Sequence, residues 1–468
     1  MRPHLDMTTV KIPVKPPLFT QILTSVIQGK SGADRFQQIL ETAVGPAPDG
    51  KYRHWDIVRH LTPPTGLTSE EFWLAMKLAR TTLYQLLPLK DVKGQPFRFA
   101  VTDGVLRKLS EIDRRLGGTL GATDQITNPQ VRDTYLITSL IEEAITSSQL
   151  EGASTTREVA KEMIQTGRAP RDRSEMMIHN NYQAMQFIRE LQDQPLTPAV
   201  VVELQRILTE RAIDEPKAAG RLRRADESIA VVDPIIGTVL HVPPAAEELD
   251  SRLKAMCDFA NAEDDEKRFM HPVIRAVLLH LWLGYDHPFV DGNGRTARAL
   301  FYWSMARRGY WLSEFISISS ILKKAPSAYS KAYLYTETDD NDATYFILYQ
   351  LHVIARAIDA LYAYLERKRR ELQEVDGMLR RSRLIRDELN HRQLALINHA
   401  LKHPLAEYTI TSHRRSHNIS YQTARTDLLE LASHHLLDRG KSGRAFVFEV
   451  PQDLQERLRR LTQTRASA

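Results

Sequence analysis

The 468-residue chain is poor in cysteine, and Cys257 as its single cysteine excludes an intrachain disulfide. A lone cysteine fits a reducing compartment and is commonly a small buried apolar residue. The chain also lacks any run of about eighteen apolar residues, so we expect no membrane span. Its start has no apolar stretch of the kind found in secretory signals, which predicts a cytoplasmic protein without a membrane partner.

Strong charge of one sign is absent as well. The chain has 63 Lys and Arg against 58 Asp and Glu, a formal net charge of +5. This excess is too small for a nucleic-acid coat protein, although a local basic patch remains compatible with it. The hydrophobic content of 42% and the charged content of 26% are ordinary for a globular protein with a substantial core. The length predicts roughly two to four domains.

Apolar residues recur at helical spacing through most of the chain, which predicts a mainly α fold. Thr68 and Glu71 stand at the spacing of a capping box, so a helix begins there and runs to about Leu87. Ile229 to Val242 is β-branched and interrupted by Asp233-Pro234 and Gly237, which predicts a β-hairpin. The other main predicted helices cover residues 33–45, 131–150, 174–192, 197–213, 245–262, 271–285, 294–308, 327–336 and 342–372.

We divide the chain into four parts. Residues 1–95 form an N-terminal helical region that braces the core and begins with a proline-rich arm. The core covers residues 96–365, a charged helical linker covers 366–389, and a compact C-terminal unit covers 390–455.

The stretch H-P-F-V-D-G-N-G-R-T-A-R, His287 to Arg298, carries the clearest chemistry. The glycine-rich turn formed by Gly292, Asn293 and Gly294 precedes a helix, whose free N–H groups and dipole attract anions such as phosphate. Arg295 and Arg298 can fork onto phosphates, and Asp291 beside them can hold Mg²⁺. His287 can accept a proton at neutral pH. We therefore predict the site of an enzyme that uses a nucleoside triphosphate.

Each of these residues alone has an ordinary structural explanation, such as a turn or a solvated arginine. Their combination is different, because eight fixed positions recur by chance on the order of once in 10^10 starting points. The string resembles the motif of the Fic family, H-P-F-x-[D/E]-G-N-G-R-x-x-R, and matches it without a departure. The resemblance covers about residues 100–365 and implies a helical Fic core with a β-hairpin flap.

The resemblance also implies an activity, which for most of the family is transfer of AMP from ATP to a hydroxyl of a target protein. It makes His287 the general base and Asp291 the Mg²⁺ ligand. The glycine-rich turn would cradle phosphate oxygens, Arg295 would assist on the phosphates and Arg298 would grip the γ-phosphate. The physical properties of these residues account for phosphate and Mg²⁺ binding, whereas attack at the α-phosphorus comes from the resemblance alone.

A second motif lies at the end of the predicted helix 131–150. Ser147 to Gly152 reads S-S-Q-L-E-G, which on local grounds is a helix C-terminus with Gly152 after its end. It also resembles the inhibitory motif of the same family, [S/T]-x-x-x-E-[G/N]. The resemblance implies that Glu151, with Ser147, pairs with Arg298 and displaces the γ-phosphate.

Two further segments have a structural and a functional interpretation. The hairpin 229–242 either holds loops in place or acts as a flap that pairs with the target's backbone, with Val231 and Val232 touching nucleotide or target. Tyr329 and Tyr333 either stack on the adenine or belong to the core. His280 lies near His287, but the spacing fits no i, i+4 metal pair, so we expect a hydrogen-bonded core residue.

The C-terminal unit reads as three helices followed by strand, turn and strand, and resembles a winged helix-turn-helix. A helix capped by Ser420 would enter a major groove, among basic residues that could meet phosphates: Arg414, Arg415, His417, Arg425, Arg439, Lys441 and Arg444. Many winged helices bind protein instead, and Asp427 and Glu430 in this helix would weaken attraction to DNA.

Two functions therefore remain open. The first is a protein adenylyltransferase that uses ATP and Mg²⁺, is autoinhibited by Glu151, and modifies another protein or itself, with a homodimer as one expected assembly. The second is a DNA-binding regulator, contacting DNA through residues 390–450, whose Fic core senses nucleotide or is idle.

Overall fold

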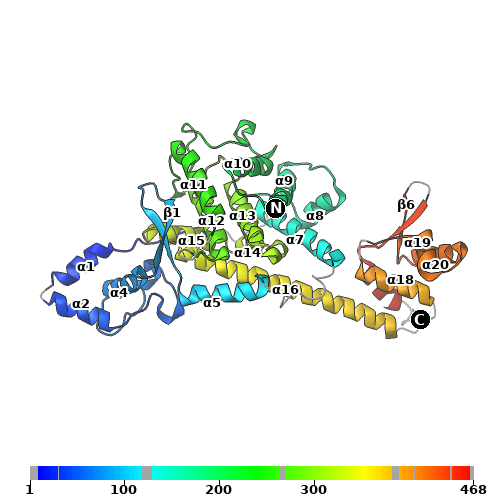
Figure 1. The fold of residues 1–468 in the computed structure, drawn as a ribbon, viewed down its shortest axis with the longest axis horizontal. Coiled ribbons are helices and arrows are strands. Elements are labelled where there is room, and N and C mark those ends of the chain that lie inside the picture. Colours follow the sequence, from blue (N-terminus) through cyan, green and yellow to red (C-terminus); the bar gives the residue numbers. More distant parts are fainter. Residues whose placement is uncertain are drawn as a thin grey trace. The chain divides into compact units, whose positions relative to one another are not determined.

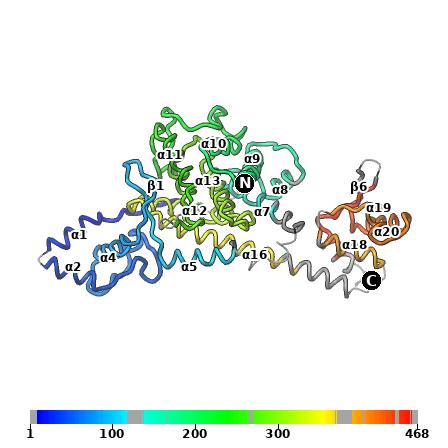
Figure 2. The backbone as a smooth tube through the Cα atoms, viewed as in Figure 1, coloured from blue at the N-terminus to red at the C-terminus, as the bar shows by residue number. Residues whose placement is uncertain are grey.

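The computed structural model describes residues 9–29, 31–117, 129–233, 235–263, 269–381, 389–403, 406–442 and 445–463. The protein is mainly helical, as predicted (Figure 1). Its chain forms two units: residues 1–121 with 136–358, and residues 122–135 with 359–468. The first unit therefore joins the N-terminal region to the predicted core, and Figure 2 traces its chain path.

The N-terminal part of the first unit contains four helices with an apolar core of their own, which includes Ile22, Ile39, Val58 and Trp73. These helices are α1 (Phe19–Ile27), α2 (Gly32–Glu41), α3 (Trp55–Val58) and α4 (Ser69–Thr81). The predicted capping box starts α4, because Thr68 accepts the Glu71 N–H while the Glu71 side chain accepts the Thr68 N–H.

The prediction that this helix reaches Leu87 is wrong. The helix α4 ends at Thr81, and a two-stranded antiparallel hairpin follows, β1 (Tyr84–Lys90) and β2 (Pro96–Ala100). The turn explains the change, because the Asp91 carboxylate accepts the N–H groups of Lys93 and Gln95. The strand β2 then buries Phe97 and Phe99 in the core.

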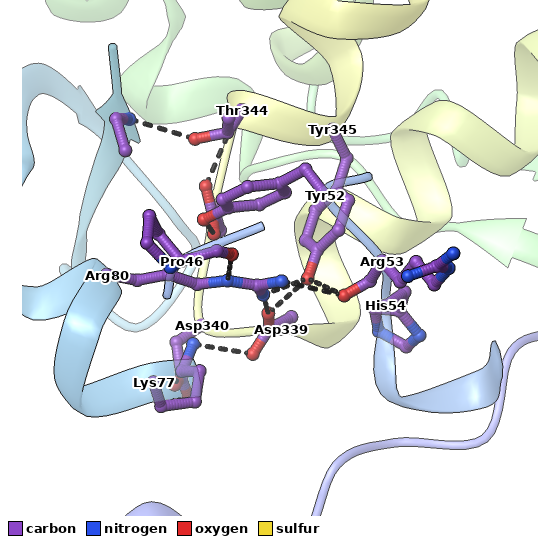
Figure 3. Close-up of polar contacts among 12 residues, drawn as sticks. Pro46, Tyr52, Arg53, His54, Lys77, Arg80, Asp339, Asp340, Thr344 and Tyr345 are labelled. Carbon is purple, nitrogen blue, oxygen red and sulfur yellow. Dashed lines mark hydrogen bonds and ion pairs between the residues drawn. The ribbon is translucent and has the colours of Figure 1, made fainter. Parts of the chain in front are cut away.

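A buried polar cluster joins the N-terminal helices to the segment between α15 (Pro326–Thr338) and α16 (Thr344–Arg381) (Figure 3). The Lys77 ammonium donates to the Asp339 carboxylate (2.8 Å), and the Tyr345 hydroxyl donates to the other oxygen (2.8 Å). Arg80 donates to Tyr345 and to the carbonyls of Pro46 and Arg53. Because both charges of the Lys77–Asp339 pair are buried, each depends on the other for its stability.

The centre of the first unit is the pair α12 (Pro272–Asp286) and α13 (Asn293–Arg307). Both helices are buried on nearly all sides, which is typical of core helices and places the intervening loop inside the protein. The helices α9 (Arg173–Glu190) and α10 (Pro198–Thr209) contact α13, and α11 (Leu249–Asn261) contacts α12. The chain also forms α5 (Asp103–Ile112), α7 (Pro129–Leu150), α8 (Arg157–Thr166) and α14 (Ile318–Leu322). The predicted hairpin is present but short, with β3 (Val231–Val232) paired antiparallel to β4 (Val239–His241).

The second unit contains the elements predicted for the C-terminal part, one further strand, β5 (Glu407–Thr409), and one further helix, α21 (Leu454–Gln463). Its helices are α18 (His391–Lys402), α19 (Ile410–His417), α20 (Tyr421–Ser433) and α21 (Leu454–Gln463). The strands β6 (Asp438–Ser442) and β7 (Ala445–Glu449) form with β5 an antiparallel sheet of order β5-β7-β6. Ser420 caps α20 as predicted, by accepting the Thr423 N–H. Arg444 lies outside the described residues.

The expectation that no segment could span a membrane needs one correction. Over Thr344–Arg367, α16 is long and apolar enough to cross a membrane by length and composition, but 56% of this apolar stretch is buried inside the molecule. Burial of this kind is typical of a core helix, so this segment is weak evidence for a span.

Candidate active site

The loop between α12 and α13 is the predicted phosphate site. Gly292 is the N-cap of α13 with φ +86°, and it provides no side chain to cap the helix. The amides of the first turn are therefore left for another acceptor, as in anion sites at helix N-termini. A side chain at Gly292 would also meet Thr209 of α10 at 2.9 Å, so the loop needs glycine for space as well.

His287 stands at the end of α12 in a left-handed conformation, φ +45°. Its Nδ1 lies 3.3 Å from the Gly284 carbonyl, which can only accept, so Nδ1 carries the proton and Nε2 has the free electron pair. Burial lowers the pKa of His287 to about 4. The ring is thus a neutral base at physiological pH, which agrees with the predicted role.

The side chains of Asn293 and Arg295 bond the loop and α10. Asn293 exchanges two side-chain hydrogen bonds with the backbone of Phe289 (3.0 and 2.8 Å). Arg295 is fully buried and donates to the Leu208 carbonyl (2.7 Å) and to Asp291 (3.2 Å). The prediction that Arg295 assists on the phosphates stays a prediction, and in this structure its two Nη groups bond α10 and the loop.

Arg298 meets the predicted inhibitory motif directly. Its Nη2 donates to the Glu151 carboxylate (2.9 Å) and to the Ser147 carbonyl (3.0 Å), while its Nε donates to the Ser147 hydroxyl (2.9 Å). Burial raises the pKa of Glu151, but the charges of Arg298 and Arg295 outweigh it, so the pKa lies below its usual range. Glu151 is therefore an anion at neutral pH.

Gly294 shows where that anion lies. A Cβ at this position would stand 2.1 Å from Oε1 of Glu151 and 3.0 Å from Nη1 of Arg298. The Glu151 carboxylate thus rests against the first turn of α13, where the free amides and Arg298 attract negative charge. It occupies the position in which the motif predicts a phosphate oxygen.

A cavity of about 200 Å³ opens beside this contact. Its walls come from the end of α7, the hairpin β3–β4, the end of α12, α13 and α15: Glu151, Val231, Leu240, His241, Gly284, His287, Gly294, Ala297, Arg298, Tyr329, Ser330, Tyr333, Leu334 and Glu337. Val231 lines this cavity, whereas Val232 does not and is 48% exposed, because neighbouring residues of a strand face opposite sides.

For Tyr329 and Tyr333 the sequence left open a place beside the adenine or a place in the core, and the two residues have features of both. Tyr329 and Tyr333 line the cavity, yet their hydroxyls are tied inward: Tyr329 lies 2.7 Å from Nε2 of His280, and Tyr333 packs against Gly284. His280 is fully buried and is a hydrogen-bonded core residue, as predicted. Burial lowers its pKa to about 3, which keeps the ring neutral.

Two residues that hold the loop were not predicted. Gln205 of α10 donates to the Asp291 carbonyl (3.0 Å) and accepts the Gly220 N–H (2.7 Å). Arg223 donates from its backbone to the Pro288 carbonyl (2.9 Å) and from its side chain to the His287 carbonyl (3.0 Å). Both residues bond backbone groups that lie far from them in the sequence, so no local sequence pattern identifies them as part of the site.

Asp291 suits a cation, although it lies outside the first cavity. Its Oδ1 accepts the Gly292 N–H and the Arg295 guanidinium, and among the described residues no donor is bonded to Oδ2. Its side chain is 33% exposed and lines a neighbouring cavity of about 600 Å³ with Glu151 and Asp214. Glu151 lines both cavities and so stands between Asp291 and the cavity beside His287.

Comparisons with known proteins agree with this geometry. The Fic/DOC family matches residues 195–305. The chain is 31% identical over 171 residues to a protein adenylyltransferase Fic of Nematostella vectensis, covering 35% of this chain and 37% of that protein. It is 41% identical over 70 residues to a namesake of Drosophila willistoni, covering 15% of this chain and 14% of that one. The chain thus spans well under half the length of these relatives.

Two solved structures are also similar. One is a Fic family protein from Desulfovibrio desulfuricans G20 with 18% identity and a TM-score of 0.48, covering 75% of this chain and 97% of that chain. The other is a fragment of Fic-1 from C. elegans with 17% identity and a TM-score of 0.44, covering 74% and 98%. The residues that match the Fic/DOC family, 195–305, include the whole motif from His287 to Arg298.

Proposed function

We propose that the protein is an adenylyltransferase that moves AMP from ATP to a Tyr, Ser or Thr hydroxyl of a target protein. The observation that carries this proposal is that a neutral His287, Arg298 and the first turn of α13 line one cavity. Relatives that share this region carry the name protein adenylyltransferase, which supports ATP as the nucleotide and a protein as the acceptor.

The proposed reaction is a single displacement. Nε2 of His287 takes the proton of the target hydroxyl, the hydroxyl oxygen bonds to the α-phosphorus, and the bond from that phosphorus to the bridging oxygen breaks. Pyrophosphate leaves with the electron pair of the broken bond. The α13 amides and Arg298 stabilise the negative charge of the phosphates during the displacement. Bound Mg²⁺ would be held by Asp291 and would neutralise phosphate charge.

We also propose that Glu151 inhibits this reaction. The Glu151 carboxylate is bonded to Arg298 and lies against Gly294 in the first turn of α13. A γ-phosphate therefore cannot bind the same Nη2 of Arg298 while this ion pair is intact. The negative charge of Glu151 would also repel the nucleotide. ATP would then bind weakly or with its α-phosphate out of line for attack.

Labelled ATP tests both proposals. Wild type, Glu151→Gly and Glu151→Gly/His287→Ala are incubated with a candidate protein mixture and ATP labelled at the α-phosphate. We expect weak labelling by wild type, strong labelling by the single variant and loss of labelling in the double variant. An absence of label in every variant would refute the transferase. Equal labelling by wild type and Glu151→Gly would refute the inhibition.

A second candidate function is DNA binding by residues 390–450, and one observation favours it. Asp427, expected to weaken attraction to DNA, is buried and bonded to Arg392 (2.8 and 2.9 Å), His413 (3.1 Å) and Asn390 (2.8 Å). Glu430 likewise accepts a hydrogen bond from Gln393. Glu430 is itself exposed, whereas the exposed residues near the start of α20 are polar or basic: Tyr421, Gln422, Arg425, Thr426, Arg414 and Arg415.

Binding to a mixed-sequence DNA duplex at low and at physiological salt tests this function. We expect salt-sensitive binding that falls when Arg425 is changed to Ala. A protein that binds no duplex even at low salt would support a protein-binding or structural role of the second unit.

A further inference from the structure

A second histidine, His241, stands in the wall of the nucleotide cavity. It belongs to β4 of the flap, where it pairs with Val231 of β3, and it is 9% exposed. Its ring packs on the ring of Tyr285 with centroids 4.7 Å apart. The motif and the resemblance gave this residue no role.

Both ring nitrogens of His241 face acceptors. Nδ1 lies 2.8 Å from Oε2 of Glu337 in α15, and Nε2 lies 2.7 Å from the carbonyl oxygen of Tyr285 in α12. A carbonyl and a carboxylate can only accept hydrogen bonds, so both contacts are made at once when the ring carries two protons.

His271 provides an internal contrast. Its Nε2 faces the Asp113 carboxylate (3.0 Å), but its Nδ1 accepts the Val273 N–H (3.3 Å). One donor and one acceptor satisfy a neutral ring, so a carboxylate partner alone does not demand the cation. The pair of acceptors at His241 does.

The charges around His241 agree with this protonation state. Burial lowers the pKa of His241, but the hydrogen bond and charge of Glu337, the Tyr285 carbonyl and the charge of Asp286 together raise it above its ordinary value. The positive ring in turn contributes to the lowered pKa of His287, so a charged His241 helps to keep the catalytic base unprotonated.

We propose that His241 is a doubly protonated positioning residue that latches the flap and α15 to the end of α12, and so shapes the nucleotide cavity. The contacts of His241 do not depend on the transferase function proposed above, but its role in shaping a nucleotide cavity rests on that function. Three walls meet at this ring: β4, the α15 segment that carries Tyr329, Tyr333 and Glu337, and the carbonyl two residues before His287. Loss of these two hydrogen bonds would let the three walls separate, although it would remove no group that touches the reacting atoms.

The protonation state is tested by ¹⁵N NMR of the full chain labelled at histidine, at pH 7. We expect both nitrogens of His241 to be protonated, while His271, assigned through a His271→Gln variant, shows one protonated nitrogen. The assignment of His241 comes from His241→Phe. A singly protonated His241 at this pH would overturn the charged latch, whatever the protein's activity.

The latch itself is tested with Glu337→Gln, which keeps a hydrogen-bonding amide at the same place but removes the charge. We expect a neutral His241 ring, faster hydrogen exchange of the flap amides and about threefold weaker ATP binding in the Glu151→Gly background, because charge-assisted hydrogen bonds are roughly twice as strong as neutral ones. His241→Phe, which removes both bonds, should weaken ATP binding about tenfold.

Asp113→Asn is the matched control, since it removes the carboxylate partner of a histidine outside the cavity, and should leave flap exchange and ATP binding unchanged. Unchanged flap exchange in both latch variants would overturn the positioning role. A protein that binds no ATP in any variant would refute the transferase, while the NMR and flap exchange would still decide the latch.

Discussion

Arg298 and Glu151, 147 positions apart in the sequence, form a direct ion pair with 2.9 Å between Nη2 and Oε1. The pair joins the last residue of the phosphate motif to the end of α7, and Ser147 completes the ring of contacts around the guanidinium. An arginine proposed for the γ-phosphate is therefore already bonded to a carboxylate within the same chain.

Removing this carboxylate should activate the enzyme. We expect Glu151→Gly to raise the rate of AMP transfer about 5- to 150-fold, the range given by coupling energies of roughly 1–3 kcal/mol between two sites. Initial rates of label transfer measure the effect. Glu158→Gln on the exposed face of α8 is the control and should leave the rate unchanged. A rate that stays at the wild-type level would contradict inhibition by Glu151.

Gly294 should be required for nucleotide, not for folding. A methyl group there would stand 2.1 Å from Oε1 of Glu151, at the place proposed for a phosphate oxygen. We expect Gly294→Ala to abolish transfer even in the Glu151→Gly background, while the melting temperature changes little, because the displaced group is a side-chain end. Gly104→Ala in α5, whose added methyl group would have no neighbour closer than 3.8 Å, serves as the control. Active Gly294→Ala protein would place the phosphates elsewhere.

The pH dependence of transfer should follow the buried base. Since His287 must be unprotonated to act and burial lowers its pKa to about 4, activity is lost only as the pH falls toward that value. We expect the Glu151→Gly variant at saturating ATP to keep its rate from pH 8 down to about 5, whereas a histidine of ordinary pKa would lose half its base near 6.5. A midpoint near 6.5 would mean that the base is solvated in the active state.

The cluster in Figure 3 should matter for stability. Asp339→Asn leaves Lys77 without its buried counter-charge, and we expect it to lower the free energy of unfolding by about 3–5 kcal/mol. Glu203→Gln in α10 is the control, because Glu203 and its partner Arg206 are both 43% exposed and their pair should contribute at most about 1 kcal/mol. Urea unfolding of both variants measures the difference. Equal effects would show that burial does not govern this cluster.

Local patterns in the sequence predicted much of the fold. Long runs of apolar residues at helical spacing, such as those of α9, α12 and α13, were found within a few residues, and the caps at Thr68 and Ser420 are where the sequence placed them. The hairpin β1–β2 was missed because its strands carry mixed apolar residues that also fit a helix, and only burial of Phe97 and Phe99 selects the strand.

The sequence by itself determined the phosphate motif, because glycine at a helix start, flanking arginines and a histidine have these properties wherever they lie. Tertiary structure decided how the motif is used. It committed Arg295 to the Leu208 carbonyl, turned Val232 outward and gave His241 two acceptors from distant helices. Hydrogen-bond partners and burial depend on elements far apart in the chain, and no spacing along the sequence records them.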